Sequence, residues 1–282
     1  MALTLDVTFA VLGAALLHAA WNAIIKSGRD PLLDTALVAL GGSLVTLPLL
    51  AVIAPPDPAS WPYLAASALI HIGYYAALAG AYRAGDLSHS YPIMRGTAPL
   101  LTATVSWLWF GEALSPAAWA GILLICGGVL SLGLVGGESG RRATRSATLW
   151  ALANAVIIAL YTIADATGVR ASGGAGRYIV WQFFFVGLPF GLLVLALKPR
   201  AFLNHCAQHW GRGLLGAGLA GISYGIALWA MTRAPVATIA ALRETSVIFA
   251  ALIGAWILKE GHVGPRLGGA AVVLAGVIAL KL

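Results

Sequence analysis

Long apolar runs dominate this sequence and constrain its fold more than any other feature. A helix that spans a bilayer needs about 20 mostly apolar residues, and the chain can be divided into ten such runs. They are 6–26, 32–54, 61–83, 89–110, 116–136, 147–168, 177–197, 212–232, 236–258 and 263–281. Only 10% of the 282 residues are charged, against about 25% in soluble domains. The sequence therefore predicts an all-α integral membrane protein with ten transmembrane helices.

The connections between these runs are short and rich in Gly, Pro and charged residues. Only 136–147 and 198–211 are longer, and we expect both to be loops. Such connections leave no room for a soluble catalytic domain, and no Gly-rich phosphate-binding loop occurs. We therefore expect a protein that is not an enzyme and that uses no cofactor.

An internal repeat divides the chain. At an offset of 148 positions, four residues of the first part recur in the second. The pairs are Arg95 and Arg243, Thr97 and Thr245, Glu112 and Glu260, and Gly121 and Gly269. At an offset of 140, Trp21 is matched by the aromatic Tyr161. We predict two five-helix repeats, 1–137 and 147–282, joined by a basic linker at 138–146. An odd number of spans inverts the second repeat, an arrangement found in secondary transporters with a substrate site near the midplane.

Small residues share one face of the fifth span. Ala117, Gly121, Gly128 and Ser131 follow helical spacing, and small residues allow membrane helices to pack closely. We expect this face to be a helix-packing surface.

The net charge of +7 is interpreted as basic loops that orient the chain in the bilayer, not as a nucleic-acid surface. Loops after odd-numbered spans carry most of the Lys and Arg, which places both termini outside the cytoplasm. No removable signal peptide is expected. Cys126 falls within a span, where a buried inert thiol is expected.

Two arginines lie inside apolar runs. At 1.5 Å per residue, Arg95 lies about 9 Å and Arg243 about 10 Å into its span, from opposite faces. Charges in the membrane interior are costly and usually functional. A guanidinium suits bidentate binding of a phosphate, phosphonate or carboxylate. The two arginines are therefore candidate substrate-binding residues. Alternatively, each pairs with a carboxylate and locks the repeats together.

Two acids also fall within spans, and both are candidate coupling residues. Glu244 could neutralise Arg95 across the repeat, or could take up a proton and couple transport. It need not pair with Arg243, because adjacent helical residues point about 100° apart. Asp165 is the other candidate, and its alternative is a residue near a helix end that reaches water.

Polar and aromatic groups around these charges complete the predicted site. Trp21 and Asn22 share a polar stripe of the first span, and Tyr161 repeats an aromatic at the matching place. Tyr75, Tyr82 and Tyr224 are further candidates, with packing or interfacial roles as alternatives. His71 is expected to be a hydrogen-bonded core histidine, and the six scattered histidines indicate no metal site.

These features resemble the drug/metabolite transporter superfamily, in its EamA-like branch. The resemblance rests on Tyr91–Pro99, on the Gly111-Glu112 turn with Ser115 before Pro116, and on the glycine-rich helix from Gly121 to Gly128. The second copy departs from the pattern, with Lys259 in place of the turn glycine. Leu17 to Asn22, followed by Lys26, is similar to a phosphonate-associated subset. The resemblance implies a multi-pass protein of the bacterial cytoplasmic (inner) membrane, and it implies cytoplasmic termini, which conflicts with the charge count.

The sequence thus predicts a secondary transporter of a small organic anion or zwitterion that works by alternating access. Two alternatives remain open. One is a proton-coupled exporter of amino acids or cationic drugs, and the other is a non-transporting flippase-type subunit. The expected partners are a small-molecule substrate and the lipid bilayer, with no nucleic acid, in a monomer or homodimer.

Overall fold

The computed structural model describes residues 3–84, 87–134, 145–256 and 263–281, which form helices and contain no β-strand. The first half comprises α1 (Leu5–Lys26), α2 (Pro31–Thr46), η1 (Leu47–Ala51), η2 (Pro58–Ser60), α3 (Trp61–Ala84), α4 (Leu87–Phe110) and α5 (Pro116–Leu134). The second half comprises α6 (Arg145–Arg170), α7 (Ala175–Leu197), α8 (Pro199–Met231), α9 (Val236–Arg243), α10 (Ser246–Trp256) and α11 (Val263–Ala279). Among the described residues, five helical segments are long and apolar enough to cross a membrane: Leu5–Ile25, Pro31–Ala51, Arg145–Arg170, Ala175–Leu197 and Pro199–Met231. The predicted all-α membrane fold is confirmed.

Local sequence explains where several helices begin. The Asp30 side chain caps α2 by accepting from the backbone N–H groups of Leu32 and Leu33, at 3.0 and 3.2 Å, and Pro31 occupies the first helical position. Ser115 caps α5 in the same way, because its hydroxyl accepts from the Ala118 N–H at 3.1 Å. Between α4 and α5 the chain turns at Gly111, whose φ of 64° favours glycine.

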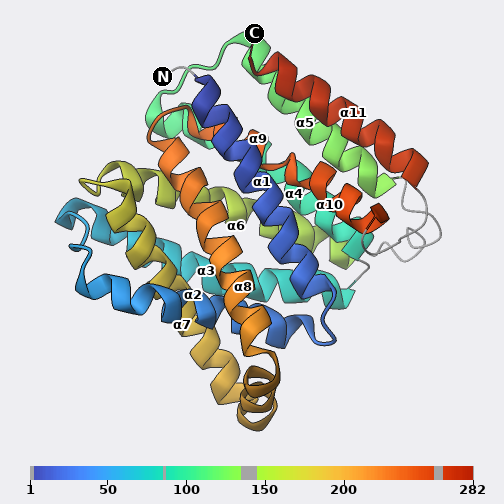
Figure 1. The fold of residues 1–282 in the computed structure, drawn as a ribbon. Coiled ribbons are helices and arrows are strands. Elements are labelled where there is room, and N and C mark those ends of the chain that lie inside the picture. Colours follow the sequence, from blue (N-terminus) through green and yellow to red (C-terminus); the bar gives the residue numbers. More distant parts are fainter. Residues whose placement is uncertain (1–2, 85–86, 135–144, 257–262, 282) are drawn as a thin grey trace.

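The halves pack with a two-fold symmetry that inverts one against the other. α3 packs on α6 as α1 packs on α8, while α2 packs on α7 and α5 on α11 (Figure 1). Asp6, which begins α1, lies near Arg233, and Arg170, which ends α6, contacts the same region by donating to the Met231 carbonyl. Equivalent helices α1 and α6 therefore run in opposite directions.

The equivalent helices α5 and α11 approach each other closely at glycines. A Cβ added at Gly121 would lie 2.8 Å from the Gly276 carbonyl oxygen, and one at Gly128 would lie 2.9 Å from that of Gly269. The converse additions at Gly269 and Gly276 meet the carbonyls of Gly128 and Gly121. The small-residue face that the sequence predicts on the fifth span is thus a packing surface for α11.

The prediction of a loop at 198–211 is wrong, because α8 begins at Pro199 and residues 199–211 form its first turns. At 1.5 Å per residue the 33-residue helix is about 50 Å long, more than a bilayer core of about 30 Å. Phe202 holds this extension in place: its side chain is buried in a cluster with Leu33, Leu37 and Phe190. The polar residues that suggest a loop lie on a helix whose apolar face has a tertiary partner.

The predicted span 236–258 is also not one helix. It divides into α9 and α10 at Glu244 and Thr245, where Val247 N–H bonds to Glu244 O and Ile248 N–H to Thr245 O. These are the tighter i to i+3 bonds. The Thr245 hydroxyl also bonds back to Leu242 O at 2.7 Å, which favours bending. In the first half, α4 stays helical through the matching Gly96 and Thr97.

Candidate functional site: a cavity between the two halves

A cavity of about 250 Å³ lies between the halves. Eight helices line it, α1 to α4 and α6 to α9, so neither half forms it alone. Its polar and aromatic lining residues are His18, Trp21, Asn22, Thr35, His71, Tyr74, Tyr75, Tyr91, Arg95, Asn154, Tyr161, Gln182, Phe183, Tyr224 and Arg243. The cavity extends to Ile25 and Pro31 at the α1–α2 turn, and reaches Arg243 at the other end.

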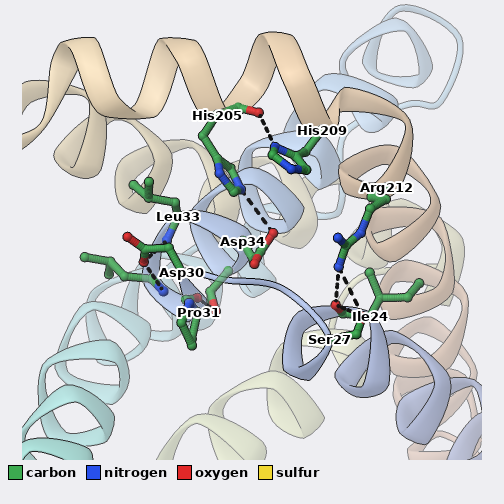
Figure 2. Close-up of polar contacts among 11 residues, drawn as sticks. Ile24, Ser27, Asp30, Pro31, Leu33, Asp34, His205, His209 and Arg212 are labelled. Atoms are coloured by element: carbon green, nitrogen blue, oxygen red, sulfur yellow. Dashed lines mark hydrogen bonds and ion pairs between the residues drawn. The ribbon is translucent and has the colours of Figure 1, made fainter. Parts of the chain in front are cut away.

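The α1–α2 turn at one end of the cavity is held by α8 (Figure 2). Arg212 donates to the Ile24 carbonyl at 2.7 Å and to the Ser27 hydroxyl at 3.2 Å. His205 Nε2 lies 3.0 Å from Asp34 Oδ1. The second half thus anchors both sides of this turn through α8, with His205 from the stretch that the sequence suggests is a loop and Arg212 from the start of the predicted span.

The two repeated arginines have different environments. Arg95 Nε lies 2.8 Å from Glu244 Oε2, and both side chains are less than a tenth exposed. Of the two roles proposed for Glu244 from the sequence, the geometry therefore fits neutralisation of Arg95 across the repeat. This ion pair joins α4 of the first half to the α9–α10 break of the second.

Arg243 lies over the ring of Tyr224, with its guanidinium carbon 4.8 Å from the ring centroid. This distance is typical of a cation–π contact. Within the part of the chain that the structure describes, no carboxylate lies at ion-pair distance from Arg243. Arg243 therefore presents a cation to the cavity without a fixed counter-ion.

Asp165 contacts the hydroxyl of Tyr224, whose side chain lines the cavity. Its Oδ2 accepts from the Tyr224 hydroxyl at 2.6 Å and its Oδ1 from the Tyr178 hydroxyl at 2.9 Å. Tyr178 is itself fixed against Gly168, where an added Cβ would overlap its ring. The Asp165 side chain is fully buried, so in this state of the protein the acid does not reach water. The site instead contains a line of contacts from Arg243 through Tyr224 to Asp165.

The structure brings most of the other predicted residues to the cavity wall. Trp21, Asn22, Tyr75 and Tyr161 all line it. Asn22 donates to the His18 carbonyl at 2.8 Å, and Tyr75 stacks on Phe190 with ring centroids 3.7 Å apart. The Trp21 indole N–H is buried without a hydrogen-bond partner. The side chain of Tyr82 lies outside the described residues.

His71 forms the hydrogen bond that the sequence predicts for a core histidine. Its Nδ1 lies 2.8 Å from the Ser67 carbonyl oxygen, and its ring packs 4.3 Å from that of Tyr161. It also lines the cavity. In the described ranges, no three His, Cys, Asp or Glu side chains gather as a metal site.

Two amides that the sequence analysis missed also line the cavity. Asn154 donates to Met94 Sδ at 2.8 Å, a weak acceptor. The side-chain oxygens of Asn154 and Gln182 are buried and have no hydrogen-bond partner among the residues that the structure describes. Both residues interrupt apolar runs in the sequence. Unpaired buried acceptors are uncommon, so these oxygens suit a ligand that carries hydrogen-bond donors.

At the end away from the α1–α2 turn, Glu112 connects three segments. It accepts from Arg170 Nη2 at 2.7 Å, from the Val236 N–H at 2.9 Å and from the Ser106 hydroxyl at 2.6 Å. Arg170 Nε also donates to the Met231 carbonyl at 2.8 Å. This network, named the Glu112 clamp, fastens the α4–α5 turn of the first half to α6 and α9 of the second.

Comparisons with known proteins agree with the fold. The EamA-like transporter family matches residues 7–134 and again 145–282. Among curated proteins, no sequence matches the chain. Of 29 similar chains in solved structures, one titled "Crystal structure of protein" superposes with a TM-score of 0.73 at 19% identity. That similarity covers 97% of this chain and 94% of the other, and at such identity it shows the fold alone.

Proposed function

Because the chain belongs to the EamA-like transporter family and is thus a multi-pass membrane transporter of small molecules, we propose that it carries a small organic anion or zwitterion by alternating access. The substrate head would be a carboxylate, phosphonate or phosphate. The two halves, 1–137 and 147–282, would move against each other around the cavity. Its place would be the bacterial cytoplasmic membrane.

One observation supports this proposal above the others: Arg243 faces the cavity over the Tyr224 ring, and no carboxylate of the described residues lies within ion-pair distance of it. Arg95, in contrast, is neutralised by Glu244. A guanidinium that no carboxylate contacts directly is costly in the membrane interior, and a bound oxyanion would lower that cost with paired hydrogen bonds. A cationic drug would meet the positive charge of Arg243 at the same place.

The size and polarity of the cavity support a small ligand with two kinds of polar group. Its volume of about 250 Å³ lies below the roughly 300–1,000 Å³ of sites for drug-sized ligands. The free oxygens of Asn154 and Gln182 suit an ammonium or hydroxyl group, and the aromatic wall can hold an ammonium by cation–π contact. Hydroxy acids and amino acids or aminophosphonates fit this description.

The first test is ligand-dependent thermal stability of the purified protein in detergent. Acetate, L-lactate, methylphosphonate and inorganic phosphate form an anion panel, and choline is the cationic comparison. A ligand at 100 times its Kd stabilises a protein by about 2.7 kcal/mol. We expect at least one anion to raise the melting temperature of the wild type, and Arg243→Gln to remove that response.

Arg177→Gln is the matched control, because Arg177 is half-buried, lies away from the cavity lining and forms an ion pair of 3.6 Å with Asp57. It should keep the wild-type response. Stabilisation by choline and by none of the anions would overturn the proposal, as would an anion response that Arg243→Gln leaves intact.

A further inference from the structure

The charged side chains around the cavity form two sets. Arg95 and Glu244 lie 2.8 Å apart and cancel each other. The second set is Arg243, which lies over the ring of Tyr224, and Asp165, which accepts a hydrogen bond from the Tyr224 hydroxyl. With an ionised Asp165 the second set also sums to zero, and with a protonated Asp165 it carries one positive charge. The histidines are counted as neutral.

Tyr224 links the two members of the second set directly. Its hydroxyl bonds to Asp165 Oδ2 at 2.6 Å, and its ring face supports the Arg243 guanidinium. A tyrosine that donates to a carboxylate has a more electron-rich ring, which holds a cation more strongly. A proton on Asp165 weakens the attraction between the Tyr224 ring and the Arg243 guanidinium. It also makes the electrostatic potential near Arg243 more positive. Both effects favour an anion on Arg243.

The charges of Arg243, Asp165 and any bound anion sum to zero in two states of the site, one empty and one loaded. In the empty state, Arg243 is balanced by ionised Asp165, and in the loaded state it is balanced by the bound monoanion while Asp165 carries a proton. A site with an anion but no proton has one negative charge, and a site with a proton but no anion has one positive charge. Uncompensated charge is disfavoured in the membrane interior, so only the neutral states would reorient readily.

We propose that Asp165 is the proton-binding residue of this transporter, and that one proton on its carboxyl group accompanies each monoanion held by Arg243. The proton comes from water on the side to which the cavity is open, forms the O–H bond on Asp165, and is released to water on the other side. No electron is transferred. This inference rests on the proposed function, because it requires an anion on Arg243.

Asp165 is better placed for this role than its neighbours. The groups that face it are Ser67 and His71 from α3, Tyr178 from α7 and Tyr224 from α8. Among these groups, His71 is the other side chain that could take up the proton, and its Nδ1 is engaged with the Ser67 carbonyl. Glu244 is engaged with Arg95, while Asp165 has tyrosine hydroxyls on both oxygens and no arginine or lysine paired with it in the described ranges.

The test separates exchange from net transport in proteoliposomes that contain the purified protein. With Asp165→Asn, the loaded site stays neutral but the empty site keeps the charge of Arg243. Exchange of a labelled panel anion, L-lactate or methylphosphonate, should therefore continue at a rate within a few-fold of wild type. Net uptake driven by a pH gradient should fall at least tenfold. Asp165→Glu should keep some net uptake, and Asp57→Asn, an exposed acid, should behave as wild type.

Proton uptake on binding gives a second measurement, which needs only the folded protein. In a weakly buffered detergent solution, a pH-sensitive dye should record one proton taken up per anion bound by the wild type. By linkage, the anion affinity should rise by up to about tenfold for each pH unit lowered. Both effects should be absent in Asp165→Asn and present in Asp57→Asn, the exposed acid.

The outcomes distinguish this inference from the proposed function. Anion binding that is lost in Arg243→Gln but takes up no proton in wild type would overturn the role of Asp165 and leave the proposed function standing. Loss of proton uptake in His71→Gln alone would assign the proton to His71 instead. An Asp165→Asn variant that loses exchange as well as net uptake would contradict the charge argument. Absence of binding by every panel anion would remove the proposed function itself.

Discussion

At the scale of residues, one substitution between the repeats separates the roles of two matched arginines. Position 244 holds glutamate where the matching position 96 holds glycine. In the first half Gly96 allows α4 to approach α5, since an added Cβ would lie 2.6 Å from Leu130. In the second half the glutamate reaches across to Arg95. Arg243 keeps no such partner in the described structure, so the repeat supplies one structural and one available cation.

We expect Glu244→Gln to destabilise the protein strongly, because it leaves Arg95 buried without its counter-charge. Breaking a buried ion pair costs about 3–5 kcal/mol, whereas replacing both partners with apolar residues is often neutral. The double variant Arg95→Met with Glu244→Leu should therefore recover most of the loss in thermal stability. It should also retain anion binding, which the proposed function assigns to Arg243. Equal stability of Glu244→Gln and wild type would show that the pair contributes little.

At the scale of elements, close glycine contacts determine how the last helices of the two halves pack. Gly128 faces Gly269 and Val273, and an added Cβ would lie 2.8–3.0 Å from their atoms. The neighbouring Gly127 has open space around its Cβ position. These adjacent positions on α5 therefore differ in packing but share the same helical backbone.

Gly128→Ala should lower thermal stability, since overpacking of this kind costs about 1–3 kcal/mol. Gly127→Ala is the matched control, and it should be neutral or stabilising because alanine favours helix by up to about 1 kcal/mol. The melting temperatures of the two purified variants in detergent provide the comparison. If both variants have the same melting temperature, the α5–α11 contact is not the tight interface that the geometry describes.

At the scale of the whole molecule, the two ends of the cavity differ. The cavity extends to the α1–α2 turn, while the Glu112 clamp joins the halves at the other end. The side chains between the Arg243 end of the cavity and the Glu112 clamp are fully buried, namely Asp165, Tyr178, Leu228 and Met231. The structure therefore corresponds to a state closed on the Glu112 side.

Glu112→Ala should shift the protein toward opening on the clamped side, because it removes the contacts to Arg170 and to the Val236 N–H. The measurement uses Ala220→Cys, which lies on the cavity wall, in a background with Cys126 and Cys206 replaced by serine. A membrane-impermeant thiol reagent should label it from the side of the α1–α2 turn, and Glu112→Ala should add labelling from the other side. Thr104→Ala, an exposed α4 position, serves as the control. Unchanged sidedness in Glu112→Ala would argue against the clamp as a gate.

Local patterns alone were sufficient to predict several features. Runs of about 20 apolar residues require membrane-spanning helices whatever they pack against. Residues close together in sequence were also enough to recognise the Ser115 cap, the small-residue face of α5 and the two intramembrane arginines. Sequence patterns and the internal repeat also indicated part of the cavity wall, including Trp21, Tyr161 and Tyr224.

Other features were decided by contacts between distant segments. The helical start of α8 depends on burying Phe202 against α2 and α7, and its polar composition alone resembled a loop. The counter-charge of Arg95 comes from the opposite half, and the burial of Asp165 comes from Tyr178 and Tyr224 on two other helices. The sequence by itself determined which charges enter the membrane. The tertiary structure decided which are paired, because pairing depends on side-chain directions and helix packing that no local pattern specifies.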